Sequence, residues 1–213
     1  MSKELKLLSI HGYMQNAEIF RKRTGAFRKL FKKKVLFDFV TAPNKIPANE
    51  ESEKDLTGWW FSSKEKSYLA QDKTDYSEGL NESLNKIAEE LQSKGPFDGI
   101  LAFSQGAALL GIICCLKEKG DERFQNFKFA ILVAGYKSRQ TEHGGMYVER
   151  ISTPTLHVIG DTDQVIPRDM SDDLLTIFEN PQVLRHDGGH FIPSTSSHKQ
   201  TYLQFLDQFL QKC

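Results

Sequence analysis

The amino-acid sequence predicts an α/β fold in which a mostly parallel sheet of about six strands carries helices on both faces. Short runs rich in β-branched and aromatic residues alternate with longer segments whose apolar residues recur every three or four positions. The short runs are hydrophobic almost throughout, as strands covered on both faces usually are. The length of 213 residues fits one domain, 1–213, with a sizeable core.

The candidate strands are six short apolar segments, which we place at residues 5–10, 35–40, 99–104, 129–134, 155–159 and 182–185. The candidate helices lie between or after them, at residues 18–31, 75–94, 105–119, 168–178 and 199–210. Helix 75–94 repeats apolar residues at helical spacing until Gly95-Pro96 ends it. Helix 105–119 is apolar nearly all round, which predicts the most deeply buried helix. Strands that alternate with helices in this way predict a parallel sheet.

Two long connections, 41–74 and 136–150, interrupt the alternation. The first is rich in Pro, Asn and Glu and contains Trp59, Trp60 and Phe61. Connections of this length in a compact domain are usually functional or mobile. Both follow predicted strands, so we expect them to lie over the carboxyl edge of the sheet, where open α/β folds bind ligands.

Charge and cysteine content argue against several classes of function. Lys and Arg together number 28, as do Asp and Glu, and a net charge of zero argues against a nucleic-acid-binding protein. The basic stretch 21–34 is interpreted as the solvated face of a helix. Three cysteines, Cys114, Cys115 and Cys213, are too few for a disulfide framework. Since no signal peptide or bilayer-length apolar run is visible, we expect a cytoplasmic protein without stable membrane insertion.

Residues 99–106, with the sequence GILAFSQG, predict a nucleophilic serine. An apolar strand leads directly into Ser104 and an apolar helix follows at once, which is the arrangement of a nucleophile elbow. The tight turn requires small residues two before and two after the serine, and these are Ala102 and Gly106. Alanine replaces the usual glycine at the first of these positions. The alternative interpretation is a plain serine at a helix N-cap.

Residues 9–16, with the sequence SIHGYMQN, follow the first predicted strand and predict part of an oxyanion hole. In serine hydrolases of this architecture, the loop after that strand contributes a backbone N–H to the oxyanion. Gly12 permits a close turn, so Tyr13 would offer its N–H beside that of Gln105. We interpret the His11 side chain as structural and hydrogen-bonded to the backbone.

The candidate acid and base lie in two segments that follow later strands: GDTDQVIP at 160–167 and RHDGGHFIP at 185–193. A serine nucleophile needs a histidine base, and the histidine needs a carboxylate that fixes its tautomer. Asp161 competes with Asp163, and we favour Asp163 because it reaches farther past the end of the strand. His186 competes with His190, and we favour His190 because the preceding glycines release it into a loop.

A metal site built on the same residues is the weaker interpretation. Asp161 with Asp163, or His186 with His190, could serve as ligands. Gly188-Gly189, however, prevents a regular helix with both histidines on one face. We therefore expect neither a metal nor another cofactor.

Five short motifs together resemble one family. They are IHGYMQ at 10–15, GWWF at 58–61, FSQG at 103–106, GDTDQV at 160–165 and HDGGH at 186–190. With these motifs the chain is similar, over about residues 5–210, to the small family of serine hydrolases typified by the ovarian-cancer-associated esterase of animals and its fungal relatives. The resemblance implies an α/β-hydrolase fold that lacks the first two strands. It also implies a catalytic triad and two oxyanion donors, which map here to Ser104, Asp163 and His190 and to Tyr13 and Gln105.

The residues and the resemblance together predict a serine hydrolase. The resemblance implies a carboxylesterase acting on aliphatic acyl esters, with a small-molecule ester that carries an apolar acyl chain as its partner. Trp59, Trp60 and Phe61 are either core packing or the wall of an acyl pocket, and a hydrophobic wall would favour longer chains. An acyl-thioesterase acting on acylated proteins or acyl-CoA would use the same triad. A ligand-binding protein on a hydrolase scaffold is the third alternative.

Overall fold

Six parallel strands form the central sheet of the computed structural model, which describes residues 4–47, 55–148 and 150–210. The strand order is β2-β1-β5-β6-β7-β8, and every neighbouring pair is parallel. The strands are β1 (Leu5–Ile10), β2 (Val35–Val40), β5 (Gly99–Phe103), β6 (Phe129–Val133), β7 (Thr155–Gly160) and β8 (Gln182–His186). The predicted parallel α/β fold is therefore confirmed. That the chain forms one domain, 1–213, stays a prediction.

The order of the strands reverses at β1, which pairs with β2 on one side and with β5 on the other. The connections that follow β1 and β5 therefore diverge from a common crevice at the carboxyl ends of the strands. Such a switch point is where open α/β sheets bind ligands. The loop after β1 and the turn after β5, which carry two of the predicted motifs, meet at this crevice.

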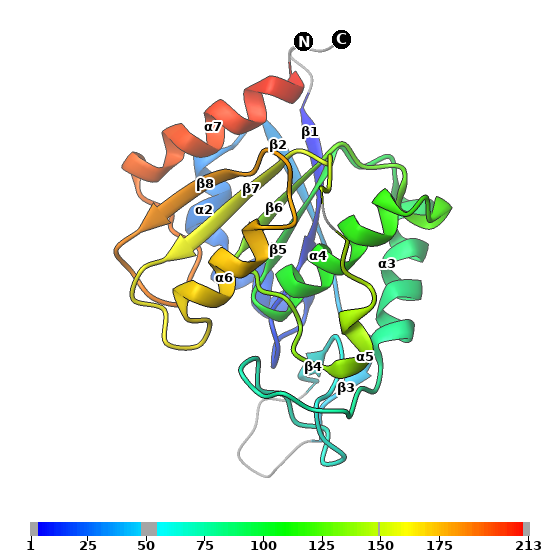
Figure 1. Ribbon diagram of the computed structural model, residues 1–213. Helices are drawn as coiled ribbons and strands as arrows, with labels where there is room; N and C mark the ends of the chain where they lie inside the picture. The colour runs from blue at the N-terminus through cyan, green and yellow to red at the C-terminus, as the bar shows by residue number, and fades with distance from the viewer. Residues whose placement is uncertain (1–3, 48–54, 149, 211–213) are drawn as a thin grey trace.

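Helices cover both faces of the sheet (Figure 1). On one face, α2 and α7 pack together through the rings of Phe27, Phe31 and Tyr202. On the other face, α6 lies beside α4, where Gly111 leaves room for Leu174. All residues of α4 from 105 to 115 are buried, as its apolar sequence predicts. The helices are α1 (Ala17–Arg23), α2 (Gly25–Leu30), α3 (Leu80–Lys94), α4 (Gln105–Glu118), α5 (Thr141–Gly144), α6 (Arg168–Leu175) and α7 (Ser196–Leu210), with a 3₁₀ helix, η1 (Glu122–Phe124).

Two predicted helices differ from those in the structure. The predicted helix 18–31 is divided into α1 and α2, because Thr24 leaves the helical conformation and its hydroxyl donates to the Phe20 carbonyl at 2.8 Å. The predicted helix 75–94 begins only at Leu80. The residue before it, Gly79, has a left-handed φ of 95°, which favours glycine and excludes helical geometry.

The long connection 41–74 contains a small antiparallel pair that the sequence did not predict. The two strands are β3 (Asn44–Lys45) and β4 (Thr57–Gly58), and they lie at the end of the molecule opposite the start of β1 and the last turn of α7 (Figure 1). Thr57 also forms a bridge with Gln15, just after β1, which ties this connection to the carboxyl edge of the sheet. Residues 48–54 of this connection, residue 149 of the connection 136–150, and Cys213 lie outside the described residues.

Cys114 and Cys115 are free and lie within the buried part of α4. Burial raises the pKa of both thiols, so both stay protonated near neutral pH and act as small apolar groups of the core. In the described part of the chain, no helix is both long enough and apolar enough to cross a membrane.

Candidate active site

Ser104 lies in a strained turn between β5 and α4. Its φ is 54° and its ψ is −120°, a conformation that non-glycine residues rarely adopt. The turn brings the helix so close to the loop after β1 that a Cβ on Gly106 would lie 2.4 Å from the carbonyl oxygen of His11. Ala102, which replaces the usual glycine, is fully buried in β5 without interrupting the strand. This is the geometry of a nucleophile elbow.

A series of hydrogen bonds joins the three residues that the sequence predicts as nucleophile, base and acid. Ser104 Oγ lies 3.0 Å from His190 Nε2, and His190 Nδ1 lies 2.7 Å from Asp163 Oδ2. Since the carboxylate accepts the proton on Nδ1, Nε2 is left to accept the proton of the serine hydroxyl. Ser104 is the N-cap residue of α4 by position, but its hydroxyl forms no capping hydrogen bond with the helix. The alternative of a serine whose hydroxyl only caps the helix is therefore wrong.

Asp163 is held in its ionised form by several donors. Its exposed fraction is 5%, and burial alone would raise the pKa of its carboxyl group. The hydrogen bonds from His190 and from the main-chain N–H groups of Ile166 and Val165 outweigh burial and lower this pKa below its ordinary value. Both N–H groups donate to Oδ1 at 2.9 Å, which leaves Oδ2 for the histidine. The carboxylate is therefore charged near neutral pH and fixed in orientation.

The two rival residues lie elsewhere. Asp161 is on the surface between Arg168 and Arg185, at 3.7 and 3.9 Å from their guanidinium nitrogens. The His186 ring packs against Phe191, and its Nδ1 accepts a hydrogen bond from the Gly188 N–H at 3.3 Å. Among the residues that the structure describes, no group of three or more His, Cys, Asp or Glu side chains could hold a metal ion.

The main-chain N–H groups of Tyr13 and Gln105 are the predicted oxyanion donors. Gln105 is the first residue of α4, so its N–H has no acceptor inside the helix. Gly12 lies against the nucleophile, because a Cβ on it would be 3.2 Å from the Cβ of Ser104. Tyr13 therefore follows the closest approach of the loop after β1 to the serine. The structure brings both segments to Ser104, and their role as oxyanion donors stays a prediction.

The His11 side chain is fully buried and bonded to the backbone, as the sequence indicates. Its Nδ1 donates to the Gly12 carbonyl at 2.7 Å, and its Nε2 accepts from the Ala42 N–H at 3.0 Å. Burial lowers the pKa of His11 to about 4, against an opposing effect of the Gly12 hydrogen bond. The ring is therefore neutral near pH 7, and it ties the loop after β1 to the segment after β2.

Trp59 supports, from the core side, both segments that carry the predicted oxyanion donors. Its indole N–H donates to the His11 carbonyl at 2.7 Å, and its main-chain N–H donates to Gln105 Oε1 at 2.8 Å. Gln105 Nε2 in turn donates to the Trp60 carbonyl at 2.8 Å. These bonds fix the loop after β1 relative to the first turn of α4, which is the kind of support that a precise site requires.

Trp59, Trp60 and Phe61 are core residues, so the interpretation of this segment as the wall of an acyl pocket is wrong. Their exposed fractions are 0%, 0% and 2%. The Trp60 indole donates to Gln140 Oε1 at 2.8 Å and packs edge-on against Tyr68. Both indole N–H groups thus find partners inside the protein, which is the condition for burying a tryptophan completely.

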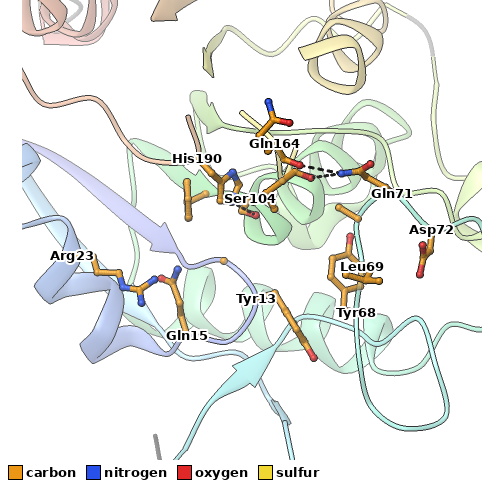
Figure 2. Close-up of a pocket in the computed structure, with 14 residues that line it drawn as sticks. Tyr13, Gln15, Arg23, Tyr68, Leu69, Gln71, Asp72, Ser104, Gln164 and His190 are labelled. Atoms are coloured by element: carbon orange, nitrogen blue, oxygen red, sulfur yellow. Dashed lines mark hydrogen bonds between the residues drawn. The ribbon is translucent and has the colours of Figure 1, made fainter. Parts of the chain in front are cut away.

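A cavity of about 620 Å³ opens beside Ser104 and His190 (Figure 2). This volume is within the usual range for small-molecule sites. Aromatic and aliphatic side chains form part of its wall: Tyr13, Tyr68, Leu69, Ala70, Phe103 and Val165. Polar and charged side chains complete it: Gln15, Arg23, Gln71, Asp72 and Gln164. The arrangement can therefore hold an apolar chain beside a nucleophilic hydroxyl.

One wall of this cavity is the segment 68–72, which the sequence analysis did not single out. Gln71 Nε2 donates to the carbonyl oxygens of Gln164 and Val165 at 3.3 and 3.2 Å (Figure 2). Arg139, from the connection 136–150, supports this wall by donating to the Gln71 carbonyl at 3.0 Å. The signal that could have found the segment is the apolar run Tyr68-Leu69-Ala70 inside a polar connection.

The fold and the site together define the class of protein. A strained serine directly after a central parallel strand, with a histidine and a carboxylate from the ends of later strands, is the arrangement of an α/β-hydrolase. The family model described as "Serine hydrolase (FSH1)" matches residues 1–202. The chain therefore belongs to this family of serine hydrolases, and the resemblance inferred from the five motifs is confirmed.

Relatives across nearly the whole chain carry the name esterase. The chain is 47% identical to esterase OVCA2 of Danio rerio, covering 96% of this chain and 97% of the relative. It is 38% identical to esterase CG5412 of Drosophila melanogaster, covering 100% of this chain and 77% of the relative. Its fold is similar to that of a Bacillus cereus carboxylesterase, with a TM-score of 0.62, 14% identity and coverage of 98% and 90%. Arabidopsis thaliana SOBER1 is also similar, with a TM-score of 0.61, 14% identity and coverage of 98% and 100%.

Proposed function

We propose that this serine hydrolase is a carboxylesterase that cleaves aliphatic acyl esters through an acyl-enzyme intermediate. The observation that carries the proposal is the hydrogen-bonded series Ser104, His190 and Asp163 beside a cavity of about 620 Å³. The names of the relatives, which are esterases, support an ester as the substrate. The apolar part of the cavity wall supports an aliphatic acyl chain.

The proposed mechanism is acyl transfer to Ser104 followed by hydrolysis. His190 Nε2 takes the hydroxyl proton as Ser104 Oγ attacks the ester carbonyl. The negative charge that develops on the carbonyl oxygen is stabilised by the N–H groups of Tyr13 and Gln105 and by the positive end of α4. His190 then gives its proton to the alcohol oxygen, which leaves. Water, deprotonated by His190, attacks the acyl-enzyme. The bond from the acyl carbon to Ser104 Oγ then breaks, His190 returns the proton to Oγ, and the acid is released.

A fluorophosphonate probe is expected to label the native protein at Ser104, because the probe reacts with a serine whose hydroxyl is activated by a base. Ser104→Ala is expected to abolish labelling, measured by fluorescence in a gel and by intact mass. Ser67→Ala, which removes an exposed hydroxyl on the connection 41–74, serves as the matched control and is expected to label like the wild type. If the folded wild type fails to label, the ligand-binding alternative replaces the enzymatic one.

The catalytic efficiency kcat/KM is expected to rise with acyl length from acetyl to decanoyl esters of one alcohol. Each methylene that becomes buried contributes about 0.8 kcal/mol, which corresponds to roughly fourfold in kcat/KM. Leu69→Asn places an amide in the apolar wall and is expected to lower kcat/KM for decanoyl esters far more than for acetyl esters. Leu36→Asn changes an exposed leucine on β2, outside the residues that line the cavity, and should leave the series unchanged. If kcat/KM of the wild type stayed constant or fell from acetyl to decanoyl esters, an extended acyl site would be contradicted.

The same series prepared as thioesters tests the thioesterase alternative. Ser104 attacks either carbonyl, and the two substrate classes differ in the leaving group. We expect kcat/KM for an octanoyl oxyester to exceed that for the matched octanoyl thioester of the same chain length. A reversed order would assign the site to acyl thioesters while leaving the roles of Ser104, Asp163 and His190 unchanged.

A further inference from the structure

A second, smaller cavity adjoins the main one at His190. Its volume is about 140 Å³, and the two cavities share Gln15, Arg23, Phe103 and His190. The rest of its lining comes from α1, α2 and the residue between them, and from the segment after the histidine: Phe20, Thr24, Phe27, Phe191, Ile192 and Ser194. Because one water molecule takes up about 30 Å³ in the liquid, this volume suits a small group rather than a long acyl chain.

The position of the base assigns the smaller cavity to the alcohol part of an ester. In the proposed mechanism, His190 Nε2, which lies 3.0 Å from Ser104 Oγ, gives its proton to the alcohol oxygen. The alcohol therefore leaves beside His190, next to the residues that follow this histidine in the chain. The larger cavity, which includes Tyr13 and the segment 68–72, is left for the acyl chain.

Gln15 brings an unsatisfied polar group to the place where the two cavities join. The residue is 4% exposed, and its Oε1 is buried without a hydrogen-bond partner among the described residues. Its amide lies beside the loop after β1, since a Cβ on Gly12 would be 3.5 Å from Gln15 Nε2. Oε1 accepts hydrogen bonds, so its burial costs free energy unless a donor satisfies it, and a guanidinium N–H of Arg23 is a donor of this kind that lines the same junction.

Arg23, the last residue of α1, adds a positive charge at the same place. Figure 2 shows its guanidinium group and the Gln15 amide pointing toward one another, with Asp72 at the opposite end of the larger cavity. No described carboxylate forms an ion pair with Arg23. No carboxylate is found among the described residues that line the smaller cavity. This junction is therefore positive and supplies hydrogen-bond donors.

We propose that Gln15 and Arg23 form a subsite for an anionic group, a carboxylate or a phosphate, carried by the alcohol part of the ester. Guanidinium N–H groups and an amide Nε2 all donate hydrogen bonds, and both anions accept them. The inference rests on the proposed esterase function and names its substrate class. Hydrolysis breaks the bond between the acyl carbon and the alcohol oxygen, water supplies the new oxygen of the acid, and the anionic alcohol leaves with a proton from His190.

Two matched substrate pairs with one octanoyl chain test this subsite. The first pair is the octanoyl ester of glycolate and that of glycolamide, which has nearly the same shape without the charge. The second is the octanoyl ester of glycerol 3-phosphate and that of glycerol. The quantity measured is the ratio of kcat/KM for the anionic ester to kcat/KM for the neutral ester, at low and high salt. For the wild type we expect a ratio above one that falls as salt screens the charge.

Arg23→Gln is expected to lower this ratio about tenfold, the effect of losing a charge-assisted hydrogen bond. Arg23→Lys keeps the charge without the planar fork and is expected to give an intermediate ratio. Arg21→Gln removes the same charge two residues away on α1, at an exposed position that lines neither cavity, and should leave the ratio unchanged.

The outcomes separate the subsite from the esterase function on which it rests. If Arg23→Gln lowers the kcat/KM ratio in just one of the two substrate pairs, that pair identifies the anion. If it lowers the ratio in both pairs, the subsite accepts either anion. The subsite is overturned if the wild-type ratio is one or less, or if Arg21→Gln lowers it as much as Arg23→Gln. Absence of turnover on every ester, together with absence of fluorophosphonate labelling, would instead overturn the esterase function.

Discussion

Replacing His190 by asparagine is expected to lower kcat for ester hydrolysis by about 10⁶-fold, the scale on which a serine hydrolase depends on its base. The imidazole lies between Ser104 Oγ at 3.0 Å and Asp163 Oδ2 at 2.7 Å. An asparagine amide fills part of this space but cannot accept and return a proton near neutral pH. The measurement is steady-state turnover of an octanoyl ester, with the melting temperature as the check that the variant is folded.

His186→Asn is the matched control for that variant, because His186 is the rival histidine four residues earlier. Its Nδ1 accepts a hydrogen bond from the Gly188 N–H, and the Oδ1 of asparagine can accept the same bond. We therefore expect His186→Asn to keep most of the wild-type kcat. A larger loss with His186→Asn than with His190→Asn would show that the base has been assigned to the wrong histidine.

Asp163→Asn is expected to lower kcat by about 10⁴-fold while the protein stays folded. The asparagine can still accept from the N–H groups of Val165 and Ile166 through Oδ1, as the carboxylate does at 2.9 Å. It would turn an N–H donor toward His190 Nδ1, which favours the tautomer that carries its proton on Nε2. That tautomer cannot accept the proton of the Ser104 hydroxyl. The measurement is kcat for the octanoyl ester together with the rate of fluorophosphonate labelling.

Asp161→Asn removes the rival carboxylate and is the control for Asp163→Asn. Asp161 lies on the surface near Arg168 and Arg185, and exposed ion pairs of this kind contribute little to stability. Wild-type kcat and an almost unchanged melting temperature are expected. If Asp161→Asn abolished turnover and Asp163→Asn did not, the carboxylate that orients the histidine would have to be reassigned.

The strands could be predicted almost completely because the information that forms them is local. The inner strands β1, β5, β6 and β7 are almost completely buried, so they appear in the sequence as nearly unbroken apolar runs. The edge strands β2 and β8 are partly exposed and carry polar residues. Helix ends were less predictable. The break at Thr24 and the late start of α3 after Gly79 depend on how these segments meet the rest of the fold. The short strands β3 and β4 have only two residues each, too few for any periodic pattern.

The sequence predicted those parts of the candidate site in which the chemistry restricts the residue type. It did not predict the parts in which only packing decides which residues contact one another. The amino-acid sequence was enough to predict the strand–serine–helix turn, with its small residues at 102 and 106, and the order of serine, acid and base along the chain. The sequence favoured Asp163 over Asp161 and His190 over His186, and the tertiary structure joins the favoured pair to Ser104 by hydrogen bonds. The tertiary structure also places the tryptophans behind the segments of the predicted oxyanion donors, and the segment 68–72 on the cavity wall. The hydrogen bonds that join Ser104, His190 and Asp163 span 86 and 27 positions, and those of Gln71 span 93 and 94 positions. Local sequence patterns do not encode contacts over such separations, because the contacts form only when distant segments pack together.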